Sequence, residues 1–435
     1  MLKYRRAGRP APSRHFGRVV GSGVLLLALS APGTAVAATD DGRWYYDLAG
    51  LAEAHQQATG EGITIGLLDS QINPAASDLA GADVTVREPS FCATETGGAA
   101  LPSIGTGSEA QHATTMAALM VGTDTGPDGG PGIPAVAPGA ALRAYTILVG
   151  DGCQSPAGVS PGRDDAVREA VADGVDIIVI PNSNAFNGPG ITEALRAGVI
   201  VIASGGNNAG LVTGTPADMN GVVATGWINS QTQLSAGSAG GDRLGVVAPG
   251  EGIRGIAATW DSYVITDGSS NSAAFTGGAL ALAWSAHPEA TGNQILQALV
   301  HTTDGEVHDP VHDKDWGYGV VNVRTLLGVD PTTYPDENPF VSDNPMLIPS
   351  ADEILATTDA DAAEDPQPSE EPAAPVAPER PAEDESADGA LVPVLVGAGV
   401  ALVLVAGVTT ALVVARRRRS ADDRRPEHQP QPPTW

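Results

Sequence analysis

Short runs of β-branched and other apolar residues alternate with helical stretches across residues 44–328, and this alternation constrains the fold more than any other feature of the chain. Apolar runs separated by helices and tight glycine turns are typical of a parallel sheet that helices cover on both faces. In such sheets the residues that carry chemistry gather at the carboxyl ends of the strands. We therefore predict an α/β domain, with strands in the runs 63–69, 141–149, 175–180, 198–204 and 221–228 and helices at 164–174 and 191–198.

The first 37 residues have the order of a secretory signal peptide. Six cations and no acid lie within the first 18 residues, an apolar stretch follows at 19–29, and small residues end in Ala35-Val36-Ala37. This order predicts a signal peptide at 1–37 that is cleaved after Ala37. An uncleaved N-terminal anchor is the alternative, although the apolar stretch is short for a membrane span.

Near the other end, residues 390–415 contain no charged side chain and lead directly into four arginines, Arg416–Arg419. At about 1.5 Å per helical residue, the run can cross a hydrocarbon core of about 30 Å. Cations that flank a span stay on the cytoplasmic side. We predict a single-pass cell-membrane protein with a transmembrane helix at 390–415, a basic cytoplasmic tail at 416–435 and an extracytoplasmic body. A buried core helix is the alternative, but the length and the basic stop count against it.

Residues 329–389 are rich in Pro, Ala, Asp and Glu, as in PQPSEEPAAPVAPERPAEDES. They offer little apolar surface to bury, so we predict a disordered stalk between the domain and the membrane. A Pro-rich docking segment is the alternative. The stretch between the signal peptide and the tail holds 48 of the 51 acids and 11 of the 23 cations. This acidity excludes nucleic acid as a partner, since nucleic-acid binding needs basic surface.

The chain has two cysteines, Cys92 and Cys153, both in the predicted extracytoplasmic part. Two cysteines in an oxidising compartment most simply form one disulfide bond. Two free thiols are the alternative. No C-x₂-C spacing is present, and we predict no metal site.

Two candidate catalytic groups lie in the first third of the chain. Asp69 ends the run 63–69, which would put its carboxylate at the active edge of the sheet. An Asx-turn or helix-capping aspartate is the common alternative. His112 precedes small and apolar residues in SEAQHATTMAALMVG, so it begins a helix that packs inward. A structural histidine is the usual alternative, but an imidazole held there is well placed to act as a base.

Two further groups lie later in the chain. The run 198–204 leads into a Gly-Gly-Asn-Asn turn, where Asn207 is either a plain turn residue or an amide aimed at an oxyanion. The stretch TDGSSNSAAFTGGALAL, residues 266–282, places serines before a run of small residues that suits a buried helix. A serine at a helix N-terminus has N–H groups directed at developing negative charge. Each signal alone is weak, but Asp, His, Ser is a known order of a catalytic triad.

These stretches resemble the motifs of the subtilase family of serine proteases. GSSNSAAFTGG resembles G-T-S-x-A-x-P-x-x-x-G, which identifies Ser270 as the nucleophile rather than Ser269 or Ser272. HATTMAAL resembles the histidine motif H-G-T-x-V-A-G, and LLDSQIN with the later Asp-Leu pair resembles the aspartate motif. ASGGNN resembles A-A-G-N. The resemblance implies a subtilisin-like peptidase domain at 61–328, with a fold of the predicted α/β class.

The arrangement of segments is similar to that of the mycosins, the membrane-anchored subtilases of type VII secretion systems. RWYYD…ATGEGITIGLLD resembles their lead-in before the aspartate motif, and a similar cysteine pair occurs in them. The resemblance implies a type VII secretion membrane complex as a partner. It also implies that the N-terminal extension, 38–60, stays and packs on the body.

The family motifs have changed at several positions. Gln71 stands in place of a glycine, Ala113 in place of the glycine after the histidine, and Ala274 in place of the motif proline. The substrate-strand motif S-L-G-G becomes Pro181, Asn182, Ser183 and a further asparagine. The backbone there normally pairs with the substrate as an added strand, and Pro181 has no N–H to give.

The resemblance implies a serine endopeptidase that acts on protein or peptide substrates without a cofactor. Ser270 attacks the peptide carbonyl, His112 carries the proton, and Asp69 orients the imidazole. Asn207 binds the oxyanion, and Pro181, Asn182 and Ser183 contact the substrate. The alternative is a catalytically weak or inactive subtilase-fold subunit that stabilises a secretion complex. A degradative secreted protease is a weaker alternative, because it gains nothing obvious from an anchor.

Overall fold

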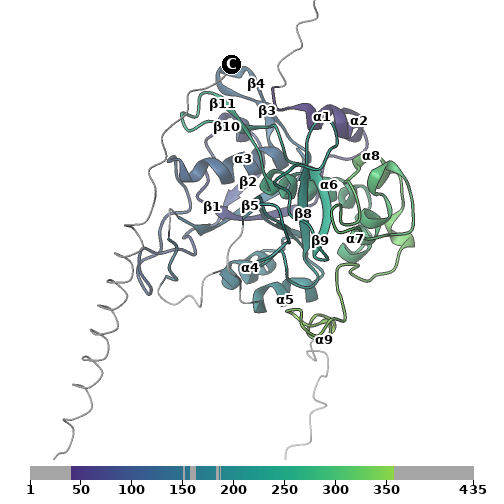
Figure 1. Ribbon diagram of the computed structural model, residues 1–435. Coiled ribbons are helices and arrows are strands. Elements are labelled where there is room, and N and C mark those ends of the chain that lie inside the picture. The colour runs from purple at the N-terminus through teal and green to yellow at the C-terminus, as the bar shows by residue number, and fades with distance from the viewer. Residues whose placement is uncertain (1–40, 150–151, 157–162, 183–185, 187, 357–435) are drawn as a thin grey trace, which may run out of the picture. The chain divides into compact units, whose positions relative to one another are not determined.

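The computed structural model describes residues 41–149, 152–156, 163–182, 186 and 188–356. Within them, seven strands form one sheet in the order β2-β5-β1-β6-β7-β8-β9 (Figure 1), and every neighbouring pair is parallel. The strands are β1 (Thr64–Ser70), β2 (Val84–Val86), β5 (Ala141–Leu148), β6 (Ile177–Ile180), β7 (Ile200–Ser204), β8 (Val223–Ile228) and β9 (Leu244–Pro249). The predicted parallel sheet is confirmed.

Two antiparallel ribbons lie outside this sheet. One pairs β3 (Thr123–Thr125) with β4 (Pro131–Pro134), and the other pairs β10 (Ile253–Ile256) with β11 (Tyr263–Thr266). The α-helices of the described part are α1 (Trp44–Ala49), α2 (Leu51–Ala54), α3 (Glu109–Val121), α4 (Arg163–Ala172), α5 (Pro189–Arg196), α6 (Ser269–Ala286), α7 (Gly292–His301), α8 (Val323–Leu327) and α9 (Ala351–Leu355). The described part also has four short 3₁₀ helices, at Ser77–Leu79, Pro127–Gly129, Thr303–Gly305 and Pro331–Thr333.

Helices cover both faces of the sheet, as the continuous apolar runs predict. Successive strand residues point to opposite faces, so Ile177 and Val179 lie in one buried cluster while Ile178 and Ile180 lie in another. The first cluster includes buried residues of α3, α6, α7 and α8, and the second includes those of α4 and α5. Both faces of each central strand are therefore buried, which explains why these strands lack an alternating polar pattern.

The order in which the chain adds strands to the sheet reverses beside β1. After β1 the chain forms β2 and β5 on one side of it, and then β6, β7, β8 and β9 on the other side. Ligands in open α/β sheets bind outside the carboxyl ends of the strands at such a switch point. Asp69 lies at this end of β1, and Pro181 follows β6 directly. The topology thus brings together two segments that the sequence separates by more than a hundred residues.

The N-terminal segment packs into the domain from its first helix. Tyr45 is fully buried, and its hydroxyl donates a hydrogen bond to the Pro134 carbonyl at 2.6 Å. Its ring meets Phe275 of α6 edge-on, with 6.2 Å between ring centroids. Within the described part of the predicted 38–60 extension, α1 and α2 therefore contribute to the first core cluster.

The predicted stalk begins too early at residue 329. Residues 329–356 pack on the domain, where Phe340 joins the first buried cluster and Ile354 the second. Asn338 donates a hydrogen bond to the Gly221 carbonyl at 3.0 Å, and α9 lies against α5. A few apolar residues spaced among Pro, Asp and Asn are enough to hold this segment, although its composition resembles that of a disordered chain.

Three predicted segments and the greater part of a fourth, the stalk, lie outside the described residues. They are the signal peptide at 1–37, the stalk from 357 to 389, the transmembrane helix at 390–415 and the tail at 416–435. None of the helices in the described ranges has the length and apolar character needed to cross a membrane.

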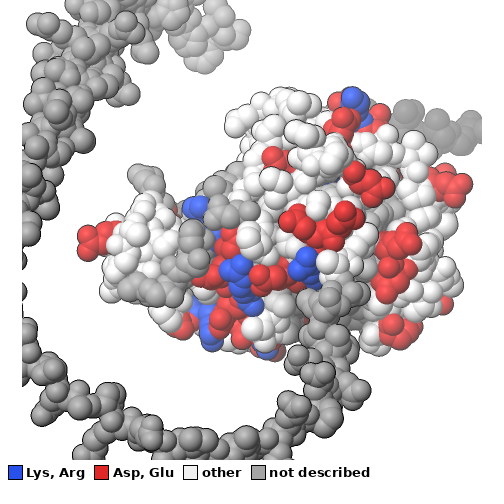
Figure 2. Space-filling view, turned by 90° about the horizontal axis from the view of Figure 1, so that it is seen from below, with Lys and Arg blue, Asp and Glu red and all other residues white. Residues whose placement is uncertain are grey.

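The surface of the described domain carries the acidity seen in the sequence. Figure 2 shows one face on which acidic side chains are widespread, while cations gather mainly in one region beside acids. Among the described ion pairs, Arg168 contacts both Asp165 and Glu193, at 2.7 and 2.9 Å. Such exposed pairs contribute little to stability, so the acidity is a feature of solubility and of long-range charge rather than of the fold.

Candidate active site

Asp69 and His112 form a hydrogen-bonded pair at the carboxyl edge of the sheet. Oδ2 of Asp69 lies 2.7 Å from Nδ1 of His112, which belongs to the first turn of α3. Asp69 is only 2% exposed, and its Oδ1 accepts a hydrogen bond from the backbone N–H of Ser70 at 2.7 Å. The carboxylate is thus fixed on both oxygens. With Nδ1 donating to Asp69, the lone pair on Nε2 is left to accept a proton.

The environment of His112 raises the pKa of the imidazole above its ordinary value of 6.5. Burial is the largest influence and lowers the pKa, but the charge of Asp69 and the hydrogen bond to it together outweigh burial. The side chain of His112 is nevertheless 42% exposed, compared with 2% for Asp69. A buried carboxylate therefore supports an imidazole that remains open to a substrate.

Ser270 is the second residue of α6, and its hydroxyl donates a hydrogen bond to the Pro181 carbonyl at 2.7 Å. Among the described residues, no hydrogen bond joins Ser270 to His112. Both side chains nevertheless line one cavity of about 340 Å³, together with Asn207. The structure therefore brings Ser270, His112 and Asn207 to a shared space, with the serine hydroxyl turned to a different acceptor.

The two neighbouring serines have structural partners. Ser269 is 1% exposed, and its Oγ donates to Oδ1 of Asn207 at 2.8 Å while accepting from the Gly206 N–H at 3.1 Å. Ser272 is fully buried and donates to the Gly226 carbonyl. Of these three serines only Ser270 lines the cavity, in agreement with the motif alignment.

Asn207 is held in one orientation by Ser269. Its Oδ1 accepts from both the backbone N–H and the hydroxyl of Ser269, each at 2.8 Å, so the Nδ2 amide is directed elsewhere. A Cβ at Gly268 would lie 3.0 Å from this Nδ2, and Gly268 has a φ of 153°, which explains the glycine at this position. Sequence reasoning did not assign a role to Ser269; its place beside Ser270, the predicted nucleophile, was the available signal.

The predicted substrate segment contacts the active residues directly. Besides the contact of Pro181 with Ser270, the side-chain amide of Asn182 donates to the Leu68 carbonyl at 2.9 Å and lies 3.5 Å from Oδ1 of Asp69. Asn182 therefore helps to hold the end of β1, a role that the sequence did not indicate. Ser183 lies outside the described residues.

The predicted disulfide between Cys92 and Cys153 is present, with 4.8 Å between the two Cα atoms. Cys92 is fully buried. The backbones also pair nearby, since the Ala93 N–H donates to the Gln154 carbonyl at 2.7 Å. The bond thus fixes two loops that follow β2 and β5 at the active edge of the sheet.

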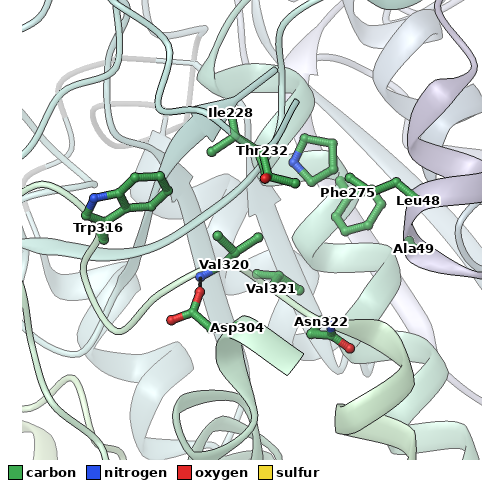
Figure 3. A pocket seen from close by; sticks show the side chains of 11 residues that line it. Leu48, Ala49, Ile228, Thr232, Phe275, Asp304, Trp316, Val320, Val321 and Asn322 are labelled. Atoms are coloured by element: carbon green, nitrogen blue, oxygen red, sulfur yellow. Dashed lines mark hydrogen bonds between the residues drawn. The ribbon is translucent and has the colours of Figure 1, made fainter. Parts of the chain in front are cut away.

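A larger cavity, of about 530 Å³, lies between α1, the ends of β8 and β9, and the segment 304–322 (Figure 3). Its walls are mostly apolar, including Phe275 and Trp316. Asp304 is its one ionisable group among the described residues, and one of its carboxylate oxygens accepts from the Val320 N–H at 2.8 Å. Without a nucleophile and base pair, this cavity is a weaker candidate for chemistry than the smaller one.

One group of side chains in the described part has the residue types and spacing that could bind a metal ion. His287, Glu289 and Asp330 offer ligand atoms that lie within 4.8 Å of one another. Glu289 and Asp330 are exposed, and none of the three lines the cavity beside His112. Groups of this kind are common without an ion, and we assign no metal to it.

The fold and the positions of these residues are those of a subtilisin-like α/β domain of the serine-protease class. Residues 60–319 match the model of the subtilase family. The chain belongs to the subtilase family.

Relatives agree with this assignment. The chain is 25% identical over 273 residues to subtilisin DY of Bacillus licheniformis, which covers 61% of this chain and 90% of the relative. Among solved structures, the prenylagaramide maturation protease PagA has a TM-score of 0.52 at 20% identity and covers 64% of this chain and 98% of its own. MycP1 from the ESX-1 type VII secretion system has a TM-score of 0.51 at 20% identity, and the match covers 70% of this chain and 90% of MycP1. These two structures share the fold.

Proposed function

We propose that the chain is a membrane-anchored serine endopeptidase that cleaves peptide bonds outside the cytoplasmic membrane. The observation that carries the proposal is the 2.7 Å hydrogen bond between Asp69 and His112, at a cavity that His112 shares with Ser270 and Asn207. A buried carboxylate, an imidazole and a serine hydroxyl at one edge of the sheet are the groups that acyl transfer to serine needs.

In the proposed reaction, the Ser270 hydroxyl first leaves the Pro181 carbonyl and donates to Nε2 of His112. The oxygen of Ser270 then attacks the peptide carbonyl as the imidazole takes its proton. Asp69 holds the tautomer and stabilises the imidazolium that forms. Nδ2 of Asn207 and the backbone N–H of Ser270, at the N-terminus of α6, stabilise the oxyanion. His112 then gives the proton to the leaving amine. In the second half of the reaction water attacks the acyl-enzyme, with His112 again acting as the base, and the serine is released.

The anchor and the secretion partner belong to the same proposal. Residues 390–415 provide the span, the signal peptide provides export, and the catalytic domain lies outside the membrane. Association with a type VII secretion membrane complex is supported by the resemblance of the N-terminal lead-in to the mycosins and by the shared fold of MycP1. Copurification of the full chain from its own membranes should recover secretion components, and a preparation without them would argue against this partner.

A second candidate function is a subunit that retains the fold and supports a membrane complex without turnover. The contact of Ser270 with Pro181 favours it, because the hydroxyl is bound away from the base. Apo structures of serine enzymes often have loose nucleophile–base contacts, so the first candidate remains the better supported.

A fluorophosphonate probe, which reacts only with activated serines, tests the proposal. The full chain is purified in mild detergent and labelled beside a Ser270→Ala variant. We expect labelling of the wild-type chain and none of the variant, because the Ser270 oxygen is the nucleophile. A folded, disulfide-bonded chain that takes no label, or equal labelling of both proteins, would refute the catalytic assignment and favour the supporting role.

A further inference from the structure

We infer that the cavity beside His112 receives the first residue after the scissile bond, and that Asp267 selects a lysine or arginine side chain there. This rests on the proposed function, since it names the substrate class of the same site. Asp267 directly follows β11 and lines the cavity together with His112 and Ser270.

The position of the cavity identifies the side of the substrate that it meets. His112 delivers its proton to the leaving amine, so the leaving-group side of the peptide must lie beside the imidazole. The acyl side is expected along the segment that begins with Pro181, and neither Pro181 nor Asn182 lines the cavity. Thr115 of α3 and Asn271 of α6 do line it. The cavity is therefore on the leaving-group side of Ser270.

The charge of the cavity comes from one residue. Among the described residues that line it, Asp267 and His112 are the ionisable ones, and no lysine or arginine is present. His112 must be neutral to act as a base, so the charge that a substrate meets is the carboxylate of Asp267. A cationic side chain is attracted to this site, while an acidic one is repelled.

Two unpaired acceptors among the described residues of the cavity suit a cation. The Gln111 amide donates one hydrogen bond to the Ile256 carbonyl, and the Asn271 amide donates to the Gly250 carbonyl. Oδ1 of Asp267 accepts from the Gly252 N–H at 2.7 Å. This leaves Oε1 of Gln111 and Oδ2 of Asp267 without a hydrogen-bond partner among the described residues. Ammonium and guanidinium groups carry only donors, which these two acceptors can satisfy.

The remaining wall suits the stem of a long basic side chain. Met116 and Ile256 line the cavity with apolar atoms. Lysine and arginine bury their methylene groups on such surfaces while the charged end remains near polar atoms. A volume of about 340 Å³ leaves room for the stem and for the charged end beside Asp267.

The test uses the full chain in detergent and a randomised peptide library, with the new N-termini sequenced by mass spectrometry. In the wild-type chain we expect Lys and Arg to be enriched about fivefold at the new N-terminus, in line with an exposed charge pair. Asp267→Asn keeps the oxygen that accepts from Gly252 and should abolish the enrichment, whereas Asp267→Lys should favour Asp and Glu. Enrichment is a ratio within each variant, so a general loss of activity does not imitate the effect.

The matched control is Asp261→Asn, which removes an exposed charge from the turn between β10 and β11. Asp261 does not line the cavity. It should keep the wild-type preference. The same preference in wild type and Asp267→Asn, or none in either, would overturn the inference while fluorophosphonate labelling of Ser270 still upheld the proposed function.

A binding measurement decides the question even without turnover. In a Ser270→Ala background, a short peptide with N-terminal Lys imitates the leaving product, and calorimetry compares it with the same peptide bearing N-terminal Ala. We expect about fivefold tighter binding of the Lys peptide, and equal binding when Asp267→Asn is added. Equal binding of both peptides without that change would refute the selection.

Discussion

At the residue scale, the site depends on side chains that are fixed by hydrogen bonds from residues adjoining the proposed catalytic groups. Ser70 fixes one oxygen of Asp69, and Ser269 fixes the amide of Asn207. Each fixing residue adjoins a proposed catalytic residue, so the motifs carry both the reacting groups and part of their support, within one motif for Ser70 and between two motifs for Ser269. This is why four short motifs could identify the candidate residues in a chain whose overall identity to its relatives is low.

The Asp69–His112 pair leads to a prediction about proton affinity. In Asp69→Asn, burial still lowers the pKa of His112, but the charge and charged hydrogen bond that raise it are gone. We expect the pKa of His112 to fall from above its ordinary value to below it. NMR titration of the imidazole measures this, with His308 as an internal control. An unchanged pKa would show that Asp69 does not govern the imidazole.

The same shift fixes the sign of two pH effects in the wild-type chain. His112 must lose its proton to act as a base, so labelling of Ser270 should rise as the pH passes upward through the raised pKa. Because the folded pKa is above the unfolded one, the ion pair stabilises the fold fully below about pH 6.5 and loses this contribution as the pH rises through the folded value.

The orientation of Ser270 could not be predicted from the sequence. The motif locates the residue at the start of α6, but its hydroxyl can turn toward His112 or toward the Pro181 carbonyl. That choice depends on the position of the chain after β6, which is set by tertiary contacts. Likewise, the amide of Asn182 meets Asp69 only because β1 and β6 are neighbours in the sheet.

At the element scale, α6 joins the proposed nucleophile to the centre of the domain. Fourteen of its eighteen residues are buried, and the helix crosses the sheet closely because small side chains face β6. Gly277 is such a position, since a Cβ there would lie 2.5 Å from Cγ2 of Val179. The alternation of apolar runs and the Ala/Gly/Leu run were sufficient to predict this arrangement of a helix in a crowded core.

This close approach predicts a cost for adding one methyl group. Gly277→Ala should lower the free energy of unfolding by up to about 2 kcal/mol, because overpacking a core costs ~1–3 kcal/mol and the gain in helix propensity offsets about 1 kcal/mol of this. Denaturant unfolding measures the change. Gly107→Ala is the control, since a Cβ there meets nothing within 4 Å. Stabilisation by Gly277→Ala would show that α6 and β6 are not in tight contact.

The elements that sequence reasoning missed are those with the weakest local pattern. β2 has only three residues, Val84–Val86, and gains its place by pairing with β5. β9, Leu244–Pro249, is not among the strands predicted from the sequence, although it forms the edge beside β8. For β2, a pairing partner far along the chain decides the structure.

At the scale of the whole molecule, the domain extends farther than the family motifs. Residues 329–356 are rich in Pro, Asp and Asn, so composition favours an extended chain. Two buried side chains, Phe340 and Ile354, and the capping box of Ser350 and Glu353 hold the segment instead. Sequence reasoning located the domain but not its end, because isolated anchors give no periodic signal.

The extent of the domain can be tested by truncation. A chain that ends at residue 328 should be less stable than one that ends at 356 by at least ~3 kcal/mol, because burial of Phe340 and Ile354 contributes roughly 1.5–3 kcal/mol each. Denaturant unfolding of the two exported domains gives the difference. Ending the chain at 370 instead of 356 should change nothing. Equal stability of the 328 and 356 chains would mean that the segment rests on the domain without supporting it.

The disulfide has a consequence for the topology of the site. Cys92 and Cys153 are 61 residues apart, and His112 lies between them in the sequence, whereas Asp69 and Ser270 lie outside. Oxidation therefore closes a covalent loop of the chain that contains His112 but neither Asp69 nor Ser270. In a reducing solution the two cysteines are free thiols, and His112 lies on a segment that is not closed by a covalent bond. In an oxidising solution the disulfide closes this segment into a loop. The loop that carries the proposed base is thus covalently closed only in oxidising surroundings.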